Sequence, residues 1–141
     1  MPPGGAVSPT ISARIVHAAL VLGVLTFGLV SWYIGQSSAV PAEALPDRKV
    51  LYVALALVSA VLFGGAMFTV GRLGPVRSGT SQDDWWRTNL GKAIVIWSLV
   101  EAPCLLGLVA YTLTHDFRTL IATFIGLLFF GSYRPSRLIE R

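Results

Sequence analysis

Four long runs of apolar residues constrain the fold of this chain more than any other feature. They extend over residues 15–34, 50–70, 93–113 and 117–133. A helix needs about 20 apolar residues to cross the roughly 30 Å of bilayer hydrocarbon. The first three runs have this length, and the fourth crosses only if Arg118 extends its guanidinium to the headgroups. Only 13% of the residues are charged, against roughly 25% in soluble domains, so the sequence predicts an all-α integral membrane protein with four transmembrane helices.

The segments outside the runs predict the orientation. We expect residues 1–11 to form a disordered Pro/Gly-rich tail without a signal peptide, and residues 12–141 to form one membrane domain. Eight Lys and Arg residues lie in the tail, the second loop and the C-terminal segment, and three lie in the other two loops. This asymmetry predicts a multi-pass protein of the cell inner membrane with both termini in the cytoplasm. We attribute the net charge of +4 to basic residues that contact anionic lipid headgroups, rather than to a nucleic-acid binding surface.

The loop between the second and third runs contains the signals of a helix start. After several glycines and a proline, Ser81 has the character of an N-cap followed by acidic residues. We therefore expect the third helix to begin near Asp83, before it reaches the membrane. Trp85 and Trp86 would then be interfacial anchors in one headgroup layer, and Trp32 would be an anchor in the other.

The first and third runs resemble each other at an offset of 79 residues. Seven pairs are identical without a gap, including the Gly-Leu-Val at 28–30 and 107–109. The repeat predicts two tandem helical hairpins that cross the membrane in the same direction. Leu22 of the first copy is replaced by Glu101 in the second.

Glu101 is the only charged residue near the middle of a predicted span. An ionised group at that depth costs a few kcal/mol, so we expect a neutral carboxyl. Ser98 lies one turn earlier on the same face, and Pro103 frees a backbone carbonyl and should bend the helix. These three residues are the candidate site for a proton or a cation. The alternative is a neutral glutamic acid that donates a hydrogen bond to a neighbouring helix.

Small residues at four-residue spacing mark helix faces that can approach closely, either inside the chain or against another subunit. The expected packing residues are Ala19, Gly23, Ala56, Ala60, Gly64, Ala122 and Gly126. Cys104, the only cysteine, is expected to be a small apolar packing residue.

Other kinds of site lack the residues they need. His17 and His115 are expected at opposite faces of the membrane, so one chain cannot bind a haem between them. The sequence contains no nucleophile–base pair, no paired metal ligands and no phosphate-binding loop. We therefore expect no catalytic site, no metal and no cofactor. A small membrane enzyme or cofactor-binding anchor would need a polar cluster at a helix end, and the spans carry too few polar residues for one.

The stretch from Ser98 to Val109, Ser-Leu-Val-Glu-Ala-Pro-Cys-Leu-Leu-Gly-Leu-Val, resembles the carboxylate-bearing helix of the rotor proteolipid, subunit c, of F-type and V-type ATP synthases. In that family a Glu-Ala pair precedes a Gly-Leu-Val, and the Glu carries the ion; it corresponds to Glu101. With a looser likeness at 59–65, the resemblance covers the second and third runs, about half the chain. Pro103 and a preceding loop of about twenty residues depart from the pattern. The resemblance implies a proteolipid-like relative among four-span bacterial membrane proteins.

Two functions follow from these features. The first is a non-enzymatic accessory or assembly subunit of a larger membrane complex, whose partners are the lipid bilayer and other membrane subunits or copies of itself. The alternative is a proteolipid-like protein that carries a proton or a cation on Glu101.

Overall fold

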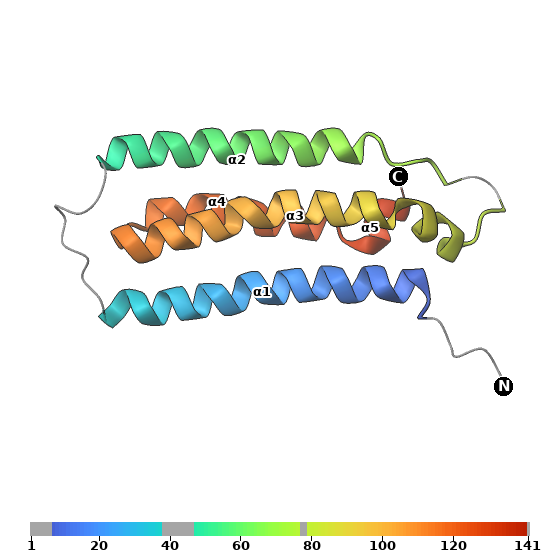
Figure 1. Ribbon diagram of the computed structural model, residues 1–141, viewed down its shortest axis with the longest axis horizontal. Helices are drawn as coiled ribbons and strands as arrows, with labels where there is room; N and C mark the ends of the chain where they lie inside the picture. The colour runs from blue at the N-terminus through green and yellow to red at the C-terminus, as the bar shows by residue number, and fades with distance from the viewer. Residues whose placement is uncertain (1–6, 38–46, 77–78, 141) are drawn as a thin grey trace.

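The computed structural model describes residues 7–37, 47–76 and 79–140, and it is built from helices joined by turns (Figure 1). The elements are α1 (Pro9–Ser37), α2 (Arg48–Val70), α3 (Gln82–Thr114), the 3-10 helix η2 (Phe117–Leu120), α4 (Ile121–Ser132) and α5 (Pro135–Ile139). The long helices α1, α2 and α3 are apolar enough to cross a membrane, and η2 with α4 forms a shorter apolar segment. The predicted all-helical class is confirmed, and the three long helices are compatible with a membrane protein.

The central element is α3, with α1 and α2 on either side of it and α4 packed along it (Figure 1). The helices α1 and α3 run in one direction, and α2 and α4 run in the other. We call the end where α1 begins and α5 ends the terminal end, and the opposite end the loop end. The helices of the first predicted hairpin, α1 and α2, run antiparallel but each pack mainly on α3 rather than on each other.

The first helix begins before the predicted boundary. Residues 1–6 of the predicted tail lie outside the described residues, but the helix is already formed at Pro9. Ser8 Oγ and Thr10 Oγ1 donate hydrogen bonds to Asp83 Oδ1 at 2.6 and 2.5 Å. Proline suits the first position of a helix, and a carboxylate is favourable beside a helix N-terminus. The start of α1 is therefore stabilised by a side chain of α3, a contact that local sequence does not reveal.

The start of α3 agrees with the prediction. The helix begins at Gln82, and Ser81 Oγ accepts a hydrogen bond from the backbone N–H of Asp84 at 3.2 Å. The Ser81 hydroxyl also donates to the Asp84 carboxylate at 2.6 Å. These bonds satisfy N–H and hydroxyl groups in the first turn, where the helix has no backbone acceptor for its N–H groups.

Two of the three predicted interfacial anchors are instead core residues. The exposed fractions of Trp85 and Trp86 are 4% and 0%, and their rings pack edge to face at a centroid distance of 4.9 Å. Trp85 Nε1 donates to the Gly74 carbonyl at 2.9 Å. Trp85 is covered by the segment around Gly74, whereas Trp86 lies against Trp97 and beside residues of α1 and α5. Trp32, with 47% of its surface exposed, remains at the surface.

The helix α3 packs closely against η2 and α4. A Cβ on Gly107 would lie 2.7 Å from both Thr119 O and Thr123 Oγ1, and a Cβ on Gly126 would lie 2.1 Å from Cys104 Sγ. Thr123 Oγ1 donates to the Cys104 carbonyl at 2.9 Å. Glycine and small residues allow this approach, as in many membrane helix pairs. Cys104 and Gly126 therefore lie against each other in the interface of α3 and α4.

Side chains from α1 and α3 bind the end of α4. Trp97 Nε1 donates to the Tyr133 carbonyl at 2.8 Å, and His17 Nε2 lies 3.1 Å from the Phe130 carbonyl. The last carbonyls of a helix have no partner within the helix, so these contacts satisfy groups that would otherwise be unpaired. His115 ends α3 at the loop end with a left-handed backbone, φ 55°. The two histidines are therefore far apart, as expected.

Candidate functional site

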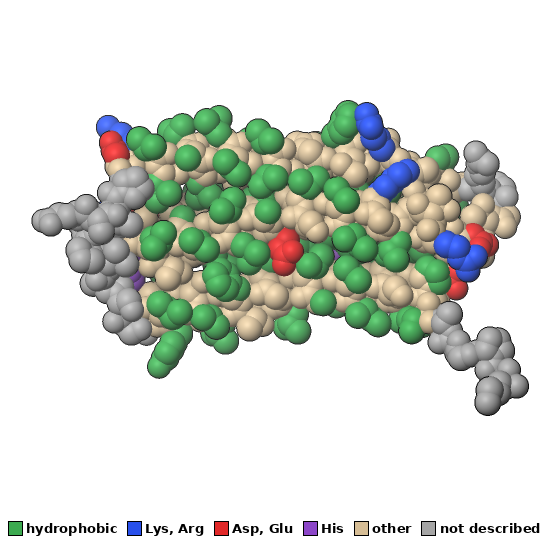
Figure 2. Space-filling view, viewed as in Figure 1, with side chains coloured by type: hydrophobic (Ala, Val, Ile, Leu, Met, Phe, Trp, Pro, Cys, Tyr) green, Lys and Arg blue, Asp and Glu red, His purple; other side chains and the backbone are tan. Residues whose placement is uncertain are grey.

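Glu101 lies partway along α3 and is partly exposed. Its carboxyl lies beside α1 at Gly23, because a Cβ on that glycine would be 3.8 Å from Glu101 Oε1. That distance is ordinary van der Waals contact, so the carboxyl lies directly against α1 at this glycine. Figure 2 shows acidic atoms reaching the surface midway along this face, within hydrophobic surroundings.

The carboxyl of Glu101 has no hydrogen-bond or ion-pair partner in the described part of the chain. Ser98 is exposed on the same side of α3, but no hydrogen bond joins it to Glu101 among the described residues. A polar group in apolar surroundings is unfavourable unless it is hydrogen-bonded. The hydrogen-bonding capacity of Glu101 is therefore available to a group outside the chain.

Pro103 does not share a face with Glu101. It is buried, and two residues of α-helix place it about 200° around the axis from the acid. The carbonyl that Pro103 leaves without a donor is that of Leu99. The structure therefore brings Glu101 next to Gly23 of α1 and does not bring it together with Pro103.

The small residues predicted to pack fall into two groups. Ala122 and Gly126 are buried, Gly126 against Cys104 of α3 and Ala122 between α2 and α4. The members of the other group are all exposed: Ala19, Gly23, Ala56, Ala60 and Gly64. For α2 the expectation of packing inside the chain is wrong, since its buried face consists of Ser59, Phe63, Ala66 and Val70. This face packs because α3 lies beside it, which four-residue spacing alone does not indicate.

Ala19 and Gly23 lie one turn apart on α1, and Gly23 borders the carboxyl of Glu101. We call the surface formed by Ala19, Gly23, Ser98 and Glu101 the Glu101 face. It combines two small residues, which permit a close approach of another helix, with a carboxyl that can donate a hydrogen bond.

One packing residue escaped the sequence analysis. Gly107 makes the close contact with η2 and α4, although it has no small neighbour at four-residue spacing toward its N-terminal side. The sequence feature that could have identified Gly107 is the Gly-Leu-Val shared by the first and third runs. The matching glycine, Gly28, also lies at a helix contact, because a Cβ there would be 3.6 Å from a methyl of Leu108.

No protein-family model, curated protein or solved structure matches this chain. Within the described residues, no group of three or more His, Cys, Asp or Glu side chains is placed to hold a metal ion. The geometry therefore defines an all-helical protein with three long apolar helices and one carboxyl at an apolar surface.

Proposed function

We propose that this protein is a non-enzymatic membrane subunit that assembles with other membrane proteins, or with copies of itself, through the Glu101 face. The observation that carries the proposal is a carboxyl at an apolar surface without a partner in the described chain. A hydrogen bond between membrane helices stabilises their association by about 0.6–2 kcal/mol. The exposed Ala19 and Gly23 support a close approach by a neighbouring helix.

The proposal includes four crossings of the inner membrane, with both termini in the cytoplasm. It is supported by the apolar segment of η2 and α4 beside the three long helices, and by α1 beginning at the end where α5 ends (Figure 1). C-terminal fusions to green fluorescent protein and to alkaline phosphatase test it. We expect a fluorescent first fusion and an inactive second fusion, and the reverse result would contradict the orientation.

Two substitutions of Glu101 test the assembly role. Glu101→Gln keeps a hydrogen-bond donor at the site, whereas Glu101→Leu removes it. A loss of about 0.6–2 kcal/mol corresponds to a roughly 3- to 30-fold weaker association for the leucine variant. The measurement is native mass spectrometry of complexes extracted from membranes in a mild detergent.

The matched control is Val95→Leu, which places leucine at another exposed position of α3. We expect this control and Glu101→Gln to retain the complexes of the original protein. A protein that is monomeric and without partners before any substitution would refute the assembly role.

A second candidate function is the transport of a proton or a cation on Glu101. It is favoured by the partial exposure of the carboxyl, which leaves it accessible for exchange, and by the proteolipid resemblance. Dicyclohexylcarbodiimide reacts with protonated carboxyls in apolar surroundings and should modify Glu101 but not the Gln variant. Proton flux into liposomes should fall in both Glu101→Gln and Glu101→Leu. Absent labelling with unchanged flux would exclude this function and leave the assembly role untouched.

A further inference from the structure

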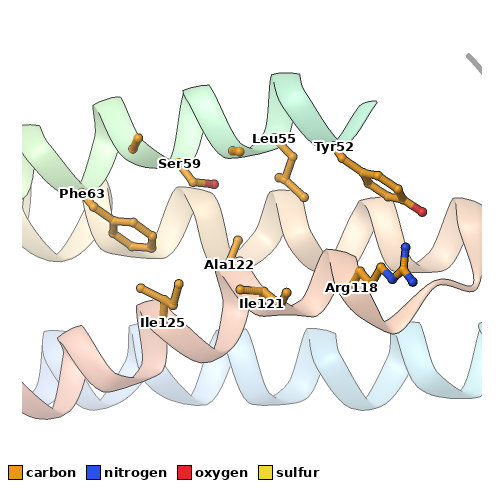
Figure 3. A pocket seen from close by; sticks show the side chains of 10 residues that line it. Tyr52, Leu55, Ser59, Phe63, Arg118, Ile121, Ala122 and Ile125 are labelled. Carbon is orange, nitrogen blue, oxygen red and sulfur yellow. The ribbon is translucent and has the colours of Figure 1, made fainter. Parts of the chain in front are cut away.

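A second feature of the surface is an apolar groove of about 520 Å³ between α2 and the η2–α4 segment. Figure 3 shows Tyr52 and Arg118 together at one end of it and Phe63 at the other. The ring of Phe63 stacks on that of Phe129 from α4, with a centroid distance of 5.0 Å. This aromatic pair bridges the two helices where the groove ends.

The length of the groove matches one leaflet of a bilayer. From Tyr52 to Phe63 the helix α2 advances by about 16 Å, at 1.5 Å per residue. The hydrocarbon core of a bilayer is about 30 Å thick, so one leaflet accounts for about 15 Å. A helix of a partner protein would need a groove along the whole thickness, and the pair of Phe63 and Phe129 interrupts it. The tail of a single lipid fits this length.

The wall of the groove is almost wholly apolar. Leu55, Ile121 and Ile125 face it from the two sides (Figure 3). The buried hydroxyl of Ser59 also lies on the wall, and it has no hydrogen-bond partner within the described residues. The space between α2 and α4 is open along this wall. Because the wall is apolar, the space suits a hydrocarbon chain.

The mouth of the groove carries a cation that is free to bind an anion. The guanidinium of Arg118 is exposed and makes no hydrogen bond or ion pair in the described part of the chain. The nearby carboxylate of Asp116 is already bound to the Tyr52 hydroxyl and to the backbone N–H of Arg118, the latter at 2.9 Å. Arg48 and Lys49 begin α2 at the same end. Among the residues that the structure describes at this end, the cations Arg48, Lys49 and Arg118 exceed the carboxylates Asp47 and Asp116 by one charge.

We propose that this groove binds one anionic phospholipid from the leaflet at the loop end. Its acyl chain lies along the groove as far as Phe63, and its phosphate binds the guanidinium of Arg118. Basic residues at the headgroup level attract anionic lipids. The inference rests on the proposed membrane placement, but it is independent of the Glu101 face, which lies between α1 and α3.

Photolabelling of the full chain tests where the acyl chain lies. The probe is a phosphatidylglycerol with a diazirine in the middle of one acyl chain, mixed into phosphatidylcholine vesicles that contain the protein. We expect the adducts, mapped by mass spectrometry, to concentrate on the groove residues of α2 and α4. Ala60→Phe fills the groove and should reduce labelling of Ile125 to the level of other outward residues. The control Ala54→Phe adds the same ring to an exposed position of α2 that does not line the groove, and it should leave the labelling unchanged.

A second experiment tests whether binding depends on the charge of the lipid headgroup. The same label on phosphatidylcholine should react less, and Arg118→Gln should lower the phosphatidylglycerol signal about fivefold, to the phosphatidylcholine level. Arg72→Gln removes an exposed cation at the terminal end and should have no effect. Labelling spread over all outward faces, or equal for both headgroups, would overturn the proposal, as would crosslinks between two copies through the groove.

Two controls separate this proposal from the proposed function. Glu101→Leu should keep the full labelling, so a failure of the assembly role does not affect the groove. Release of the protein from membranes by an alkaline carbonate wash would refute the membrane placement on which both proposals rest. Retention in the membrane with uniform labelling would refute the lipid site alone.

Discussion

Replacing Gly107 with alanine tests whether α3 and α4 pack as closely as the structure shows. The added methyl group would lie 2.7 Å from Thr119 O and 2.7 Å from Thr123 Oγ1. Both distances are shorter than van der Waals contact, so one partner must move. The threonine hydroxyl can rotate, but the Thr119 oxygen belongs to the backbone. The substitution therefore forces a shift of η2 relative to α3.

The expected magnitude combines two opposing effects. Overpacking a tight contact destabilises a fold by about 1–3 kcal/mol, whereas alanine favours a helix over glycine by up to about 1 kcal/mol. Gly91, in the same helix, has open space where a Cβ would be added, so Gly91→Ala gains only the second effect. The difference between the two variants, about 1–3 kcal/mol, isolates the contact of Gly107.

Equilibrium unfolding in mixed micelles of dodecyl maltoside and sodium dodecyl sulfate measures this difference, with far-ultraviolet circular dichroism as the signal. We expect Gly107→Ala to unfold at a lower dodecyl sulfate fraction than Gly91→Ala. Gly64→Ala, also at a site with no neighbour within 4 Å, serves as a second control. Equal stability of Gly107→Ala and Gly91→Ala would refute the close packing of α3 on η2 and α4.

Three other contacts give predictions that the same unfolding assay can check. Gly126→Ala should destabilise the fold because its methyl would lie 2.1 Å from Cys104 Sγ, and adding Cys104→Ala should restore part of the loss. The hydrogen bond from the Tyr52 hydroxyl lowers the pKa of Asp116, so this carboxylate stabilises the fold above the ordinary pKa of about 4. That stabilisation should disappear as the pH falls through the lowered pKa, and Tyr52→Phe should weaken this pH dependence. Trp97→Phe removes a buried donor to a carbonyl at the end of α4, and it should cost about 1–3 kcal/mol.

Each of these predictions has a result that would contradict it. If the stability losses of Gly126→Ala and Cys104→Ala simply add in the double variant, the added methyl group and the Cys104 sulfur are not in contact. If the unfolding midpoint of Tyr52→Phe depends on pH in the same way as that of the original protein, the Tyr52 hydroxyl does not lower the pKa of Asp116. Trp32→Phe, at an exposed ring, is the control for Trp97→Phe, and similar stabilities of the two variants would exclude the bond to α4.

Local sequence was sufficient for the helices themselves. The run from 50 to 70 became α2 (Arg48–Val70), because a helix is the only short segment that satisfies its own backbone groups in an apolar environment. Ser81 and its acidic neighbours placed the start of α3 correctly, since capping depends on residues within one turn. The position of Glu101 along α3 was also readable from sequence. Its location beside Gly23 of α1 was not.

The burial of the two tryptophans shows what local sequence could not provide. An aromatic pair beside a predicted span is typical of an interfacial anchor. Trp85 and Trp86 are instead buried. Trp86 lies against Trp97 and beside α1 and α5, and the first indole donates to the carbonyl of Gly74 in the preceding loop. That contact joins residues eleven positions apart and depends on the path of the loop.

The sequence by itself determined that the long apolar runs are helices, that α3 begins near Ser81, and that an acid lies partway along α3. Only the tertiary structure decided which face of each helix is buried: Ala60 is exposed while Ser59 is covered, and Gly107 rather than Gly64 makes a close contact. The physical reason is that these helices are apolar on all sides. In a membrane, lipid and protein interior have similar polarity, so hydropathy does not distinguish a packed face from a lipid-facing one. The distinction comes from the fit of small residues against a neighbouring helix, which exists only once the helices are assembled.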